Sequence, residues 1–461
     1  MRDIAKPTFK IGPAVEALNL MPDFPEHLVP EDAQPNKALL DYVPRIPISE
    51  RDRRWSELRK RMTAAKVDVL ILLGNDIYWD MGYANIRYLS GTFSKITSHM
   101  IFPRRGEPIL WADIPHMNRP FNMGLSVSDW VKDIRGMQGI ANICATVKDM
   151  GLDRGRVGLV GFSNVVQTTT TLLHDDVQLV KRMLPDAQFI EFGWVFEDMR
   201  MVKSEAELDM QRHAGRIHRE TIDVMAQSSV PGARESEVYA NMLRHQIASG
   251  ADPNIFYLFG AGPVEHPKNE LWSLLHGQDV PRAPTMRPLA EGDLVIAEFH
   301  TRYGGYNTHA EYTVYVGDKP PQQLLDIWDV CVETLDVARK VMRTGTTLRE
   351  AWTAIRKPAD DAKMDWVELG FHAKGIGSPE FPAVVYKEGY AFVTGNGMEH
   401  GDFELRNGMA IGINIDIFDP RWKPDVGCMY GDFLVVRDDG GETLIDPPRE
   451  IGIGGQTPKR A

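Results

Sequence analysis

Residues 294–317 read LVIAEFHTRYGGYNTHAEYTVYVG and predict two β-strands joined by a tight turn. The turn is Gly304-Gly305, because glycine tolerates the positive φ angles that a two-residue hairpin loop requires. Apolar and β-branched residues fill both flanking runs, as is typical of strands with a buried face.

Four ionisable side chains interrupt the hairpin: Glu298, His300, His309 and Glu311. Residues two apart on a strand share a face, so each arm contributes one pair. Charged groups are costly to bury unless they are paired or functional. The four side chains therefore indicate a functional site. The alternative interpretation is that some of them point to solvent from an edge strand.

Composition indicates a globular protein of two or three domains. The chain has 461 residues, 43% hydrophobic and 25% charged, with a net charge of -12. The excess of acidic residues and the lack of Lys/Arg runs argue against binding to nucleic acid and against binding to an anionic membrane surface. Three scattered cysteines form neither a disulfide framework nor a zinc motif. With no signal-peptide core at the amino end and no apolar run of membrane-spanning length, we expect a cytoplasmic protein.

Composition and periodicity predict an arm and two domains. Residues 1–50 are rich in proline and lack periodicity, which favours an extended arm. Residues 51–196 alternate strand and helix signals, which predicts an α/β domain. In residues 197–455, Ser204 and Glu207 form a capping box that opens a long helix. Further helices are expected at about 235–249, 322–343 and 347–359.

Several segments resemble the pita-bread family of creatinases, prolidases and methionine aminopeptidases. They are the run from Arg287 to Glu298, the hairpin ending YTVYVG, and the segments AKGIG (373–377), LRNGMA (405–410) and GDFLVV (431–436). The resemblance implies an α/β (α+β) fold with a pita-bread C-terminal catalytic domain and a smaller α/β creatinase-type N-terminal domain. It also implies a homodimeric hydrolase of C–N bonds, or a related lyase, acting on a small polar metabolite.

Metal-dependent members of that family hold two divalent ions with two aspartates, one histidine and two glutamates. Carried over by position, these ligands fall on Glu298, His309, His372, Asn414 and Gly431. Two adjacent cations need anionic oxygen ligands, which an amide and a glycine do not supply. We therefore expect no two-metal site, unless a shift of alignment brings Asp416 or Asp432 in.

The creatinase-like branch uses the same fold without metal, with a histidine as acid/base. The resemblance places this histidine at His276, and His266 is the alternative position. A histidine suits the acid/base role because it titrates near neutral pH. Glu311 corresponds to the hairpin glutamate of that branch. We expect Glu311 and Glu298 to orient substrate or water, and His372 to polarise or bind the substrate.

Two alternatives stay open. Glu298, His300, His309 and His372 form a candidate ligand set for one zinc or iron ion, because histidines with one carboxylate suit these metals. The other alternative is a peptide-binding module without catalysis. Convergence of His276, Glu311 and His372 on one closed cavity is the discriminating observation.

Substrate contacts are expected from five further positions. Arg87, in the run NIRYLSG (85–91), resembles the turn of the N-terminal domain that faces the active site of the partner subunit, and an arginine suits a carboxylate. His300, His309, Glu380 and Tyr306 are the other candidates.

Overall fold

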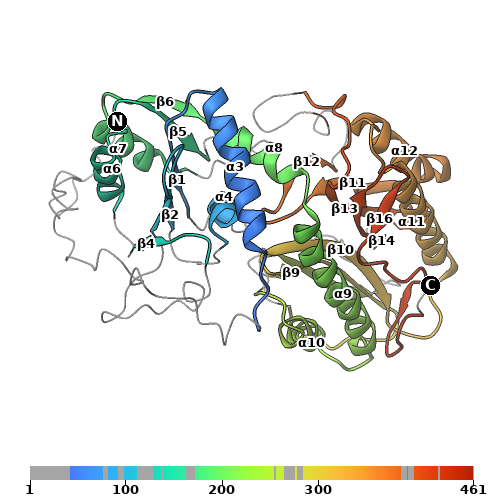
Figure 1. Ribbon diagram of the computed structural model, residues 1–461. Coiled ribbons are helices and arrows are strands. Elements are labelled where there is room, and N and C mark those ends of the chain that lie inside the picture. The colour runs from blue at the N-terminus through green and yellow to red at the C-terminus, as the bar shows by residue number, and fades with distance from the viewer. Residues whose placement is uncertain are drawn as a thin grey trace, which may run out of the picture.

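The computed structural model describes residues 42–75, 81–91, 98–111, 129–135, 139–161, 172–253, 256–263, 276–277, 284–385, 392, 399–423 and 426–459. Three sheets organise these residues, one in the N-terminal half and two in the C-terminal half. Figure 1 shows the two halves side by side, with helix α3 (Ile48–Ala64) and helix α8 (Gly193–Met201) between them.

The N-terminal sheet has the strand order β4-β3-β2-β1-β5-β6. Its strands are β1 (Val69–Leu73), β2 (His99–Pro103), β3 (Ile109–Trp111), β4 (Asp133–Arg135), β5 (Arg156–Val160) and β6 (Gln188–Glu191). The accompanying helices are α4 (Met81–Ser90), α6 (Ile140–Asp149) and α7 (His174–Met183). Strands and helices thus alternate in this half, as the sequence predicts.

Strand β1 shows why this half folds as layers. All five residues of its sequence VLILL are buried. Leu70 and Leu72 pack with Trp55 and Leu58 of α3, whereas Val69 and Ile71 belong to the cluster that includes α6 and α7. A strand covered on both faces reads as a continuous apolar run, which is the signal present here.

The C-terminal half holds two sheets with helices on their outer sides. The first sheet has the order β17-β10-β9-β7-β8 and the second the order β12-β11-β13-β15-β16, with β14 paired to β13. The strands are β7 (Tyr257–Pro263), β8 (His276–Gly277), β9 (Asp293–Tyr303), β10 (Tyr306–Tyr315), β11 (Asp365–Ala373), β12 (Glu380–Val384), β13 (Ala410–Phe418), β14 (Gly427–Met429), β15 (Phe433–Val436), β16 (Gly441–Thr443) and β17 (Gly452–Ile453). The helices are α9 (Glu205–Ser228), α10 (Glu235–Ala248), α11 (Gln322–Val341) and α12 (Leu348–Ala362). Helix α9 contacts β9 and β10, while α11 and α12 contact β13 and β11.

The central hairpin is confirmed. Strands β9 and β10 pair antiparallel through the Gly304-Gly305 turn, at which both glycines have positive φ angles of 56° and 84°. Helix α9 begins with the predicted capping box, in which Ser204 accepts from the Glu207 amide and Glu207 accepts from the Ser204 amide. The three other expected helices are present as α10, α11 and α12.

The segment expected as a turn around Arg87 is helical. Residues 85–90 are the C-terminal part of α4, whose Tyr83, Ile86 and Leu89 are buried at helical spacing. Gly91 ends the helix with a φ of 65°, and its amide donates to the Arg87 carbonyl at 2.9 Å. A glycine in this left-handed conformation is a common helix stop. The prediction of a turn around Arg87 was therefore wrong, because residues 85–90 are helical and the chain leaves the helix only at Gly91.

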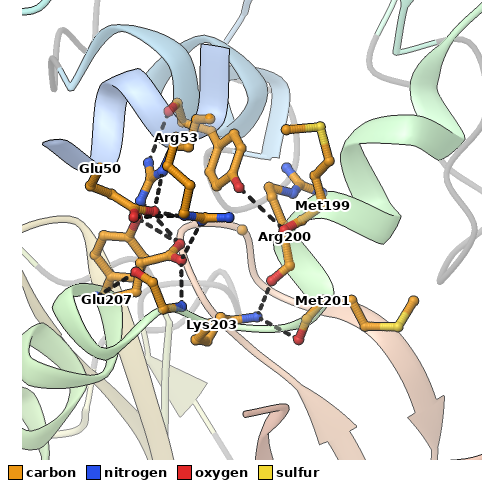
Figure 2. Close-up of polar contacts among 12 residues, drawn as sticks. Glu50, Arg53, Met199, Arg200, Met201, Lys203 and Glu207 are labelled. Atoms are coloured by element: carbon orange, nitrogen blue, oxygen red, sulfur yellow. Dashed lines mark hydrogen bonds and ion pairs between the residues drawn. The ribbon is translucent and has the colours of Figure 1, made fainter. Parts of the chain in front are cut away.

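A buried network of charged and polar groups joins the two halves. Arg54 of α3 donates to Glu50 at 2.8 Å and to the hydroxyl of Tyr306 at 2.9 Å, and its guanidinium lies 3.2 Å from Glu207. Figure 2 shows the labelled members Glu50, Arg53 and Glu207 meeting at this joint. The hairpin turn is thus anchored to the N-terminal half.

Candidate functional site

The hairpin register brings the four ionisable side chains together. His309 pairs with His300, and Glu311 pairs with Glu298, across β9 and β10. Residues directly opposite in antiparallel strands share a face, so the four side chains lie on one face of the sheet. All four are buried. The cluster faces β11 and β13 of the second sheet, where Glu311 accepts from the Ile415 amide at 3.0 Å.

Glu298, His309 and His372 form the tightest group. The His309 Nε2 atom lies 2.7 Å from the Glu298 carboxylate, and the rings of His309 and His372 are 4.8 Å apart. One ligand atom from each of the three lies within 4.8 Å of the other two. Burial, and after it the nearby Lys374 ammonium, lowers the pKa of both histidines, so they are neutral at neutral pH.

His300 has a different partner. Its Nε2 atom lies 2.6 Å from the Nζ atom of Lys374, and Lys374 also donates to the Ser378 hydroxyl at 3.2 Å. The His300 ring stacks on Phe256 with centroids 4.6 Å apart. In this arrangement His300 contacts a lysine ammonium, and the centre of its ring lies 5.5 Å from the centre of the His309 ring.

A second group surrounds Asn414 of β13. The Asn414 amide nitrogen donates to Glu311 at 2.8 Å and to Glu368 of β11 at 3.2 Å. Asp416, two residues further along β13, is buried near Glu311. Glu368 keeps part of its surface exposed. The site therefore contains four carboxylates, those of Glu298, Glu311, Glu368 and Asp416.

Burial and mutual repulsion hold protons on these carboxylates. Burial raises the pKa of Glu298 to about 7, although Lys374 and Asn414 act in the opposite direction. Burial and the neighbouring Glu298 raise the pKa of Glu368 to about 8. The pKa values of Glu311 and Asp416 are also raised, first by burial and then by the other carboxylates. Groups that titrate near neutral pH are suited to proton transfer.

Sequence reasoning missed Glu368, Lys374 and Ser378. The signal for the first two was a period of two along β11 and its end, Glu368-Gly370-His372-Lys374, which places polar groups on the face of His372. Asp416 follows Asn414 at the same period on β13. Gly412, opposite His372, provides space: a Cβ atom there would lie 2.8 Å from the His309 ring.

Tyr306 and Glu380 lie elsewhere. Alternation along β10 directs Tyr306 to the face opposite His309, where its hydroxyl donates to Glu207 at 3.1 Å in the joint between the halves. Glu380 is 2.7 Å from the Lys203 ammonium and 3.6 Å from Arg200. Figure 2 shows Arg200 and Lys203 beside this joint. In the described chain both candidate substrate contacts have structural partners.

The remaining candidates are only partly described. The backbone of His276 forms β8, in register with Phe259 of β7, and His266 lies outside the described residues. Arg87 is 2% exposed within its own chain, and its guanidinium lies 5.2 Å from the ring centre of Tyr83. Roles for His276 and Arg87 stay predictions.

The two-metal site of the family does not fit these residues. Asn414 presents its amide nitrogen to the carboxylates, and a Cβ atom at Gly431 would lie 2.3 Å from the Ile413 carbonyl oxygen, so no side chain fits there. Asp432 is held away by Arg339 at 2.8 Å and by the Phe433 amide at 2.7 Å. Glu368 and Asp416 bring the number of carboxylates in the site to four, but they occupy other positions than the family ligands do.

Comparisons with known proteins agree with this architecture. The family model "Creatinase/Prolidase N-terminal domain" matches residues 54–202, and the family model "Metallopeptidase family M24" matches residues 209–438. The chain belongs to metallopeptidase family M24, and the expected fold class, a pita-bread domain behind a creatinase-type domain, is confirmed. Among the described residues, no helix is long and apolar enough to cross a membrane.

Individual relatives are distant. The chain is 28% identical over 263 residues to the "Probable dipeptidase PepE" of Mycobacterium tuberculosis, which is 56% of this chain and 62% of the dipeptidase. It is 22% identical to the ectoine hydrolase of Halomonas elongata over 87% of this chain and 96% of that protein. An X-Pro aminopeptidase from Thermotoga maritima shares the fold with a TM-score of 0.68 and 17% identity, over 87% of this chain and 99% of that one.

Proposed function

We propose that the protein hydrolyses a C–N bond in a small substrate that carries a cationic group, without the two-metal centre of its family. One observation carries the proposal. The site gathers the carboxylates of Glu298, Glu311, Glu368 and Asp416, while Lys374 is the cationic side chain that acts on Glu298 and Glu368. A buried excess of negative charge is costly unless protons or a bound cation offset it. An ammonium or amidinium group of the substrate would do so.

The residues divide into two roles. Glu311, Glu368 and Asp416, arranged around Asn414, receive the cationic end of the substrate. Glu298, with a pKa of about 7, takes and returns the proton, and His309 orients its carboxylate. His276 is the second candidate for proton transfer. Assembly as a homodimer, with Arg87 of the partner subunit at the substrate carboxylate, belongs to the proposal as well.

The test is hydrolysis by metal-depleted protein. After dialysis against a strong chelator and elemental analysis, we would assay X-Pro dipeptides, dipeptides with free amino ends and N-acyl diamines by chromatography of the released amine. We expect turnover to survive chelation, and acetylation of the free amine of the substrate to abolish it. Loss of activity that returns with zinc, iron or manganese would overturn the metal-free proposal, and no hydrolysis of any substrate would favour a binding module.

A single-metal hydrolase is the second candidate. The observation in its favour is that ligand atoms of Glu298, His309 and His372 lie within 4.8 Å of one another. Two histidines and one carboxylate are a known ligand set for zinc and for iron(II). His300, which was expected as a fourth ligand, contacts Lys374. The metal content of the purified protein separates the two candidates.

A further inference from the structure

Lys374 lies at the centre of the site. It follows directly after β11 and is 2% exposed. Its Nζ atom is 2.6 Å from His300 and 3.2 Å from the Ser378 hydroxyl, so two side chains from different segments fix its position. A lysine ammonium is a compact point charge, and burial strengthens its field.

Lys374 approaches the Glu298/His309/His372 group through His300. Its Nζ atom contacts the His300 ring, and the centre of that ring lies 5.5 Å from the centre of the His309 ring. Glu298, His309 and His372 are the residues whose ligand atoms converge. The positive charge of Lys374 is therefore next to the place where these three would hold a metal ion.

We propose that Lys374 is the resident electrophile of this site: its ammonium binds the carbonyl oxygen of the scissile C–N bond and replaces the charge of a metal ion. This inference rests on the proposed function. The oxygen of water adds to the carbonyl carbon while the Glu298 carboxylate takes a water proton, and the C=O electron pair moves to the oxygen beside Lys374. The C=O bond then re-forms, the C–N bond breaks, and Glu298 gives the proton to the leaving nitrogen. The products are one carboxylic acid and one amine.

Ser378 and His300 act as positioning residues in this scheme. Both contact the Nζ atom directly, and both are buried. Donors aimed at a developing oxyanion contribute most when they are fixed before the reaction begins. The arrangement also opposes metal uptake, because two cations in one buried site repel each other.

Metal uptake gives a test that needs no substrate. Zn²⁺ alone would be titrated into wild-type protein, Lys374→Met and Lys374→Gln, with Lys357→Met as the control. Lys357 is an exposed lysine of α12 whose partner is Asp361. We expect both Lys374 variants to bind Zn²⁺ at least about tenfold more tightly than the wild type, and His309→Ala in the Lys374→Met background to remove the gain. Equal affinity in the wild type and in a folded Lys374 variant would overturn the proposal.

Activity gives the second test. With a substrate found for the wild type, Lys374→Met should lose about a hundredfold or more in kcat, as removal of an oxyanion donor does elsewhere, with KM changed much less. Lys374→Arg should recover part of the loss because it keeps the charge. A metal-depleted Lys374→Met enzyme with wild-type kcat would refute the role of Lys374. Failure of the wild type to hydrolyse anything would instead refute the proposed function, while the zinc titration would still decide the place of Lys374.

Discussion

Among individual residues, the carboxylates of the site show how burial and neighbouring charges change the pKa of a side chain. Glu298 and Glu311 face each other across the hairpin, and Glu368 approaches from β11. An ordinary glutamate is ionised at neutral pH, but burial and like-charged neighbours favour the protonated form. The pKa of Glu298 is raised to about 7 and that of Glu368 to about 8. Each therefore changes its charge near the pH at which enzymes commonly work.

This predicts a stability that falls as the pH rises from about 4.5 to about 8. Both groups have a folded-state pKa above the unfolded value of 4.5, so their stabilising effect is complete below pH 4.5 and is lost as the pH rises through 7 to 8. Glu368→Gln stays neutral and keeps an acceptor for Asn414. We expect its Tm, relative to the wild type, to be higher at pH 9 than at pH 6, as measured by circular dichroism. Glu333→Gln, on the exposed side of α11, should give the same difference at both pH values. A pH-independent difference for Glu368→Gln would contradict the raised pKa.

Among strands and helices, sequence reasoning succeeded where the signal is local. The Gly304-Gly305 turn, the alternation in β9 and β10 and the Ser204 capping box all depend on neighbouring residues, and all are present. The pairing of β11 with β13 joins segments some forty residues apart. A register shift between Trp366 and Leu369 further obscures the face of Glu368. For this reason Glu368 and Lys374 were missed, although their spacing from His372 was visible.

Close packing around β13 gives a prediction about the position of the lost family glutamate. A Cβ atom at Gly431 would lie 2.3 Å from the Ile413 carbonyl oxygen and 3.2 Å from the Glu311 amide nitrogen, so backbone must move to admit it. We expect Gly431→Ala to lower the free energy of unfolding by about 2 kcal/mol, in the range of overpacked cores. Urea unfolding would measure the loss. Gly441→Ala on β16 is the control: its nearest contact, at 3.0 Å, is a Leu434 side-chain atom, so its loss should be smaller. Equal losses would show that Gly431 has more room than the structure indicates.

In the whole molecule, the joint between the halves connects the N-terminal domain to the hairpin turn and to the segment after β11 that holds Lys374 and Ser378. Arg54 contacts Glu50, Glu207 and Tyr306, and its guanidinium lies 4.1 Å from the ring centre of Tyr88. Further along, Lys203 bonds to Glu380, which accepts from the Gly377 amide next to Ser378. Tyr306 and Ile376 pack in a core cluster whose other buried residues lie between Trp55 and Met199. The segment that holds Lys374 is therefore supported from both halves.

Removal of the central arginine of this joint should uncouple the halves. In Arg54→Met the buried carboxylates of Glu50 and Glu207 lose a shared cation, and breaking a buried ion pair from one side costs about 4 kcal/mol. We expect calorimetry to show one transition for the wild type and an earlier, separate transition of the N-terminal half for Arg54→Met.

Arg53→Met is the matched control for this experiment. Arg53 is the next residue of the same helix and also contacts Glu50, at 2.7 Å, but its side chain is 47% exposed. Exposed ion pairs contribute at most about 1 kcal/mol, so this variant should keep a single transition close to the wild-type Tm. Suppose both variants unfold in one transition at nearly the same temperature. The buried network would then contribute little, and the apolar contacts of Tyr306 and Ile376 would be what holds the halves together.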